Sequence, residues 1–135
     1  MDKLKFFVDD DNSHFRSGII FYLEQILKHK VIAEAADGAD FLEQEDKYMS
    51  ADIILMDIQL PEIDGVMATK QLIWHYHKVR VIAVTDFQGI CGLDELVSAG
   101  FKACVYKNRI YDDLPLAIKL VNEGKLHYPG EIQSK

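Results

Sequence analysis

Four short apolar stretches, each followed by polar residues, constrain the fold of this chain most strongly. They are rich in β-branched and aromatic residues, and their apolar residues are continuous rather than alternating. This pattern is typical of parallel strands that are buried on both faces. The stretches are residues 6–8 before Asp9 and Asp10, 53–56 before Asp57, 81–84 before Thr85, and 103–106 before Lys107.

Helical patterns alternate with the apolar stretches along the whole chain. The alternation predicts a (βα)5 arrangement, an α/β fold whose parallel sheet has helices on both faces. Asn12 or Ser13 is expected to cap the first helix, Gly100 and Gly124 to end the last two, and Pro115 to lie in a first turn. Strands are expected at about 4–8, 31–35, 52–56, 80–84 and 102–106, and helices at about 13–29, 38–46, 64–76, 88–99 and 112–123.

Composition restricts the class of protein. A length of 135 residues suits one domain. With a net charge of -7, the chain is not expected to have the basic surface that direct DNA binding requires. Two cysteines are too few for a zinc site or a disulfide framework, and the N-terminus has no signal-peptide core. The apolar runs are too short to cross a membrane. We therefore expect a cytoplasmic protein with no membrane partner, in which the polar residues 125–135 form a tail or the start of a linker.

The polar residues at the strand ends suggest phosphoryl chemistry. In an open parallel sheet, ligands bind beyond the carboxyl ends of the strands. Carboxylates crowded there repel one another, and a hard divalent cation with room for water, Mg2+, relieves the repulsion. Asp57 would be a nucleophile toward phosphorus, while Thr85 and Lys107 would neutralise the transferred group. Each residue alone has an ordinary structural explanation, but their joint occurrence at successive strand ends favours a site.

The chain resembles the receiver domain of two-component response regulators. The resemblance is carried by residues 8–10, 54–65, 84–85 and 99–107, with Val8-Asp9-Asp10 and Leu55-Met56-Asp57 among the matching motifs. It implies a flavodoxin-like, doubly wound sheet of order 2-1-3-4-5 over residues 1–124, and a regulatory domain rather than an enzyme.

The resemblance also implies roles for individual residues. Asp57 would be phosphorylated by a histidine kinase or a phosphotransfer protein. Asp10, Asp57 and the backbone carbonyl of Gln59 would hold Mg2+, with Asp9 acting through water. Thr85 and Lys107 would contact the phosphoryl group.

The C-terminal segment, residues 114–128, is similar to the last receiver helix and linker of LuxR-type (NarL/FixJ-like) regulators. This similarity implies transcriptional output through the fourth and fifth helices and a DNA-binding output domain that is not part of these residues. It also suggests a homodimer through the first and fifth helices, with Leu116, Lys119 and Leu120 on the contact face.

Three residues depart from the receiver pattern: Asp86 after the threonine, Cys104 at the usual aromatic position, and Asn108 after the lysine. We expect Asp86 to slow phosphorylation, the Lys107–Asn108 peptide to be trans, and the fourth helix to begin irregularly at Gly89 and Gly92.

Two alternatives remain open: a degenerate receiver that binds proteins constitutively, and a Mg2+-dependent aspartyl phosphatase. The phosphatase usually has a second acid two residues after the nucleophile, where this chain has Gln59.

Overall fold

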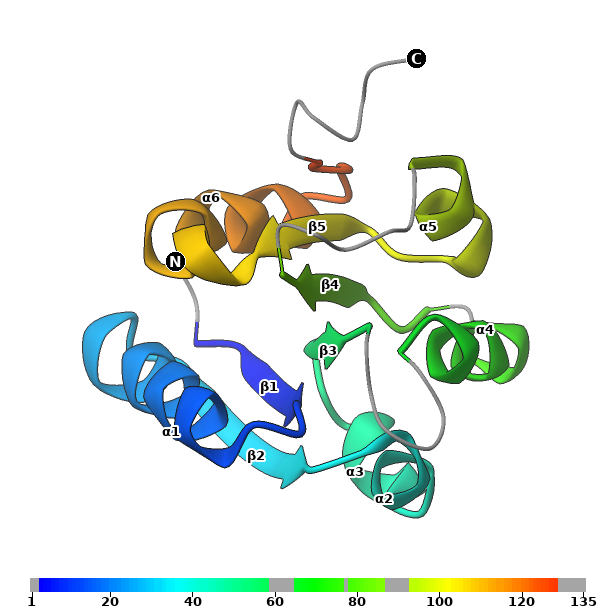
Figure 1. Cartoon of the computed structure of the whole chain (residues 1–135), viewed down its shortest axis with the longest axis horizontal. Coiled ribbons are helices and arrows are strands. Elements are labelled where there is room, and N and C mark those ends of the chain that lie inside the picture. Colours follow the sequence, from blue (N-terminus) through cyan, green and yellow to red (C-terminus); the bar gives the residue numbers. More distant parts are fainter. Residues whose placement is uncertain (1–2, 59–64, 77, 87–92, 129–135) are drawn as a thin grey trace.

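The computed structural model describes residues 3–58, 65–76, 78–86 and 93–128. Its centre is a five-stranded parallel sheet of order β2-β1-β3-β4-β5 (Figure 1), which confirms the predicted α/β class and strand order. Each strand lies within about one residue of the expected range, because a continuous buried stretch has sharp ends. The strands are β1 Lys5–Asp9, β2 Lys30–Ala35, β3 Ile53–Asp57, β4 Val81–Thr85 and β5 Ala103–Tyr106.

Helices cover both faces of the sheet. On one face lie α1 (Ser13–Phe21), continued by the π-helical turn η1 (Tyr22–Ile26), and α6 (Ile110–Asn122). On the other lie α2 (Gly38–Leu42), α3 (Glu45–Tyr48), α4 (Gly65–His75) and α5 (Leu93–Ala99) (Figure 1).

The core divides into two hydrophobic clusters, one on each face, because successive strand residues point to opposite sides. Phe6 packs under α1 and α6, whereas Phe7 packs under α2 and α3. β1, β3 and β4 are therefore buried on both faces, and their carboxyl ends are held in fixed positions beside one another.

The helix ends follow local sequence signals. The side chain of Asn12 accepts a hydrogen bond from the Phe15 amide and caps α1. Gly100 and Gly124 have positive φ angles of 102° and 84°, as expected for residues that end helices. The expected helix at 38–46 is instead two short helices, and α6 begins at Ile110. Pro115 is thus inside α6 rather than in its first turn, so that expectation was wrong.

Residues 125–128, expected to belong to a tail or linker, lie along the outer edge of β5. His127 bridges Ala103, its carbonyl accepts from the Cys104 amide at 3.0 Å, and its own amide donates to Lys102. Tyr128 is buried and its hydroxyl donates to the Phe101 carbonyl at 2.9 Å. This segment therefore packs as part of the domain.

Candidate functional site

Polar side chains from four strand ends meet at one edge of the sheet. Asp57 is the last residue of β3, Thr85 is the last residue of β4, and Lys107 directly follows β5. Asp10, just after β1, is 2 % exposed, and Asp57 is 3 % exposed. Burial of two carboxylates this close together requires compensation by positive charge.

Lys107 supplies that compensation. Its Nζ lies 3.0 Å from Asp10 Oδ2 and 3.4 Å from Asp57 Oδ2, and 4.7 Å from the centre of the Phe15 ring. Burial alone would lower the pKa of Lys107, but its hydrogen bond to Asp10 and the charge of Asp57 outweigh this and raise the pKa above its ordinary value. Lys107 therefore stays cationic between the two carboxylates.

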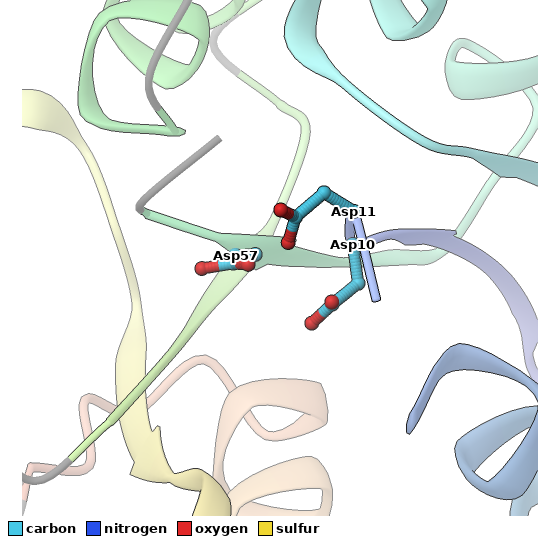
Figure 2. A group of neighbouring side chains, drawn as sticks. All are labelled: Asp10, Asp11 and Asp57. Carbon is cyan, nitrogen blue, oxygen red and sulfur yellow. The ribbon is translucent and has the colours of Figure 1, made fainter. Parts of the chain in front are cut away.

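Three carboxylates are placed to hold a cation: Asp10, Asp11 and Asp57, shown in Figure 2. One oxygen from each lies within 4.8 Å of the others. Asp11 is exposed while Asp10 and Asp57 are buried, so the group is open to solvent on one side. Three anionic oxygens and open positions for water fit a hard divalent ion such as Mg2+. Gln59, whose carbonyl was expected to complete this set, lies outside the described residues.

Asp9, which was expected to act on the metal through water, is not one of these three carboxylates, and Asp11 is. Asp9 ends β1 and is 1 % exposed, and neither of its carboxylate oxygens has a hydrogen-bond partner among the described residues. Burial first, and then the charges of Asp37, Asp57, Asp10 and Asp40, together raise the pKa of Asp9 to about 9. The carboxyl is therefore neutral at physiological pH.

The strand end explains why Asp11 was missed. Asp9 still follows the alternation of β1, whereas the chain leaves the strand after it and turns toward the cap of α1 at Asn12. The two residues between a strand and a helix cap are the ones free to turn toward a neighbouring strand end. The position of Asp10 and Asp11 directly before Asn12 was the available sequence signal.

Thr85 and Asp86 occupy different environments at the end of β4. Thr85 is 2 % exposed, and its Oγ1 has no hydrogen-bond partner in the described part of the chain. A buried hydroxyl without a partner is costly, which suggests that a ligand completes it. Asp86 is exposed.

The expected trans peptide between Lys107 and Asn108 is confirmed, since no described peptide bond is cis.

Comparison with known proteins identifies relatives across nearly the whole chain. A family model described as the response regulator receiver domain matches residues 6–119. The transcriptional regulatory protein DegU of Brevibacillus brevis is 31% identical over 123 residues, which are 91% of this chain and 52% of that protein. The chain thus spans about half the length of this relative.

Solved structures agree with the fold. A LuxR-family two-component response regulator from Aurantimonas sp. SI85-9A1 has a TM-score of 0.87 and 25% identity, covering 97% of this chain and 93% of that one. The isolated REC domain of RcsB from Salmonella enterica serovar Typhimurium, with the phosphomimetic BeF3-, has a TM-score of 0.83 at 23% identity, covering 97% and 96%. Within the described residues, every helix is too short or too polar to cross a membrane.

Proposed function

Because the chain belongs to the response regulator receiver domains, we propose that it is a phosphorylation-operated switch that accepts a phosphoryl group on Asp57 with the help of Mg2+. The observation that carries the proposal is the arrangement of Asp57, Asp10 and Lys107, in which the ammonium lies within 3.4 Å of both carboxylates. An inert acidic loop would not need such a buried countercharge.

Asp57 would act as the nucleophile. One of its oxygens attacks the phosphorus of a phosphohistidine, a new P–O bond forms, and the P–N bond breaks as the imidazole leaves with the electron pair and takes up a proton. The transferred group carries charge on its equatorial oxygens, so catalysis depends on neutralisation more than on acid–base chemistry. The Lys107 ammonium and the Thr85 hydroxyl would each donate to one of these oxygens.

Asp10, Asp11 and Asp57 would hold the metal. When bound, Mg2+ supplies positive charge that offsets repulsion between the carboxylates and the incoming phosphoryl oxygens. Lys107 would exchange its contact with the Asp57 carboxylate for one with the phosphoryl group. The carbonyl of Gln59 remains a proposed ligand on the basis of the resemblance alone.

The phosphoryl donor would be a histidine kinase or a phosphotransfer protein. The output would be transcription, as the name of DegU states for that protein. With a net charge of -7, the chain would act on DNA through an additional output domain. The phosphoryl group would act on this output through the fourth and fifth predicted helices, which correspond to α5 and α6.

The proposal is tested by incubating the protein with Mg2+ and a small acyl phosphate and measuring the intact mass. The parent should gain one phosphoryl group, and Asp57→Asn should gain none, because an amide oxygen is a poor nucleophile. Labelling that Asp57→Asn does not reduce would contradict it. A parent that gains no group would favour the degenerate receiver, and steady release of inorganic phosphate with many turnovers would favour the phosphatase.

A further inference from the structure

Asp10 is held in place at each of its polar groups. Its amide donates to the Ala35 carbonyl at 3.1 Å, and its Oδ1 accepts from the Asn12 amide at 2.9 Å. Its Oδ2 lies 3.0 Å from Lys107 Nζ. Its backbone carbonyl accepts a hydrogen bond from Nη1 of Arg16. Lys107 already has a proposed role at the phosphoryl group. Arg16 is the other side chain among these contacts, and it has no proposed role so far.

The carbonyl contact matters because of where it lies in the chain. A peptide unit is planar, so the Asp10 carbonyl and the Asp11 amide share one rigid plane. Fixing that carbonyl fixes the plane from which the Asp11 side chain leaves the backbone. A single hydrogen bond from Arg16 thus orients the link between two of the three clustered carboxylates.

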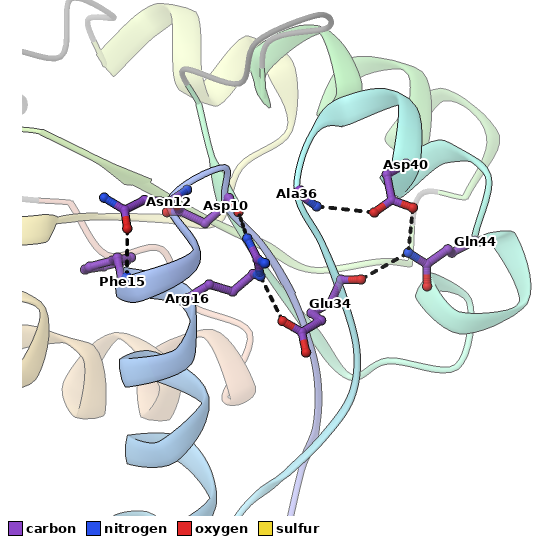
Figure 3. A network of polar contacts seen from close by, with 8 residues as sticks. All are labelled: Asp10, Asn12, Phe15, Arg16, Glu34, Ala36, Asp40 and Gln44. Carbon is purple, nitrogen blue, oxygen red and sulfur yellow. Dashed lines mark hydrogen bonds and ion pairs between the residues drawn. The ribbon is translucent and has the colours of Figure 1, made fainter.

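Arg16 is itself held on its far side by β2. Its Nε donates to Oε1 of Glu34 at 2.8 Å, and its side chain is 16% exposed. Gln44 Nε2 donates to the Glu34 carbonyl at 3.1 Å and to Asp40 Oδ1 at 3.3 Å, which ties the network to α2 (Figure 3). The guanidinium can make both contacts because it is a planar fork with several donors, whereas a lysine ammonium is a point charge.

We propose that Arg16 is a positioning residue for the metal site, which uses Glu34 as its anchor to orient Asp10 and Asp11 for a divalent cation. The inference rests on one part of the proposed function, the binding of Mg2+, and does not depend on phosphoryl transfer. Groups that orient metal ligands in this way contribute about tenfold to 100-fold in metal affinity.

A positioning role and a simple charge effect predict opposite changes in Mg2+ affinity when Arg16 is replaced. Removing a positive charge near an anionic site should by itself strengthen cation binding. Loss of positioning should weaken it. Arg16→Met, which removes the charge and the donors, should therefore raise the Kd for Mg2+ about tenfold or more. Arg16→Lys, which keeps the charge and loses the two-sided contact, should also raise it.

The experiment measures Mg2+ binding by calorimetry at fixed ionic strength, after the unfolding curve of each variant has been recorded without metal. Lys30→Gln removes one positive charge at the opposite end of β2 and serves as the control, with a Kd unchanged within about twofold. In a double-mutant cycle, Glu34→Gln should have little effect once Arg16→Met is present, because the two residues act as one unit.

A second readout separates positioning from general destabilisation. With an acyl phosphate donor, the Arg16 variants should need more Mg2+ for half-maximal phosphorylation but should approach the parent rate at saturating Mg2+. If the parent binds Mg2+ and the Arg16 variants bind it equally or more tightly, the inference is overturned. A parent that binds no Mg2+ overturns the metal site of the proposed function, and the inference with it.

Discussion

Among single residues, Asp9 is the most unusual, because it is a buried carboxyl with neighbours that are mostly acidic. The pKa of Asp9 is raised from 3.8 to about 9 by burial first and then by the charges of Asp37, Asp57, Asp10 and Asp40. Between these two pH values the folded protein retains a proton that the unfolded chain has lost. Its stability therefore falls as pH rises through this window.

Asp9→Asn, which resembles the neutral form, should remove this dependence. We expect its advantage in unfolding free energy over the parent, in Mg2+-free buffer, to grow from about pH 5 to about pH 8. The growth cannot exceed about 1.4 kcal/mol per pH unit, the value for one proton. Denaturant unfolding across that range measures it, with the exposed Asp46→Asn as control. An advantage that is constant with pH would show that Asp9 is ionised in the folded protein.

The sequence predicted which polar residues lie at the strand ends but not the direction of each side chain. Asp57 and Thr85 were placed at the ends of β3 and β4 because each ends a continuous apolar stretch. Asp9 and Asp11 could not be told apart in the same way, since the last paired residue of a strand depends on its neighbours. β1 pairs through Asp9 with Ala35 and Met56, and this pairing decides that Asp11, beyond the strand, reaches the acidic group.

At the scale of elements, a contact between η1 and α6 compensates for a proline. Pro115 has no amide hydrogen, so the Tyr111 carbonyl lacks the helical partner it would otherwise have. The hydroxyl of Tyr22 donates to that carbonyl at 3.1 Å, and the two tyrosine rings pack edge to face with centroids 4.8 Å apart. A helix interrupted by proline is thus completed by a side chain from η1.

Tyr22→Phe should lower the unfolding free energy by about 1 kcal/mol, because the carbonyl loses its donor. In the Pro115→Ala background the amide of residue 115 can serve the same carbonyl, so Tyr22→Phe should cost distinctly less there. Urea denaturation of the four proteins in this cycle measures the coupling. Equal costs in the two backgrounds would mean that the hydroxyl contributes nothing through this carbonyl.

The boundaries of the strands were predicted more accurately than those of the helices, for a physical reason. The strands are buried on both faces, so their apolar sequence stops where the strand stops. α6 begins two residues earlier than expected because Ile110 is buried and starts the helix, although the charged residues Asp112 and Asp113 follow it. The start of the fourth predicted helix, at Gly89 and Gly92, falls outside the described residues and stays a prediction.

For the whole molecule, the α1–α6 face presents more exposed apolar surface than a solvated face requires. Phe21 is 61% exposed, and Tyr111 and Leu116 are each 50% exposed. Leu120, expected on the contact face, is only partly exposed, whereas Lys119 is exposed. We keep this face as the proposed surface for a weak, symmetric homodimer.

Phosphorylation should shift the monomer–dimer balance toward the dimer, and Leu116→Arg should prevent that shift by placing a charge in the interface. Sedimentation with and without Mg2+ and beryllofluoride measures both effects. Met49→Arg is the control, because Met49 is 51% exposed near α3, on the other face of the sheet. If Leu116→Arg and Met49→Arg dimerise like the parent, the α1–α6 face is not the interface.

The central claim is that Asp57, among several neighbouring carboxylates, carries the phosphoryl group. Borohydride reduces an acyl phosphate on aspartate to homoserine and leaves free carboxylates intact, so peptide sequencing by mass spectrometry can locate it. After phosphorylation with Mg2+ and a small acyl phosphate, the account predicts homoserine at position 57 and unmodified aspartate at 9, 10 and 11. Homoserine at any of those three positions, or none at 57 in protein that has gained a phosphoryl group, would contradict it.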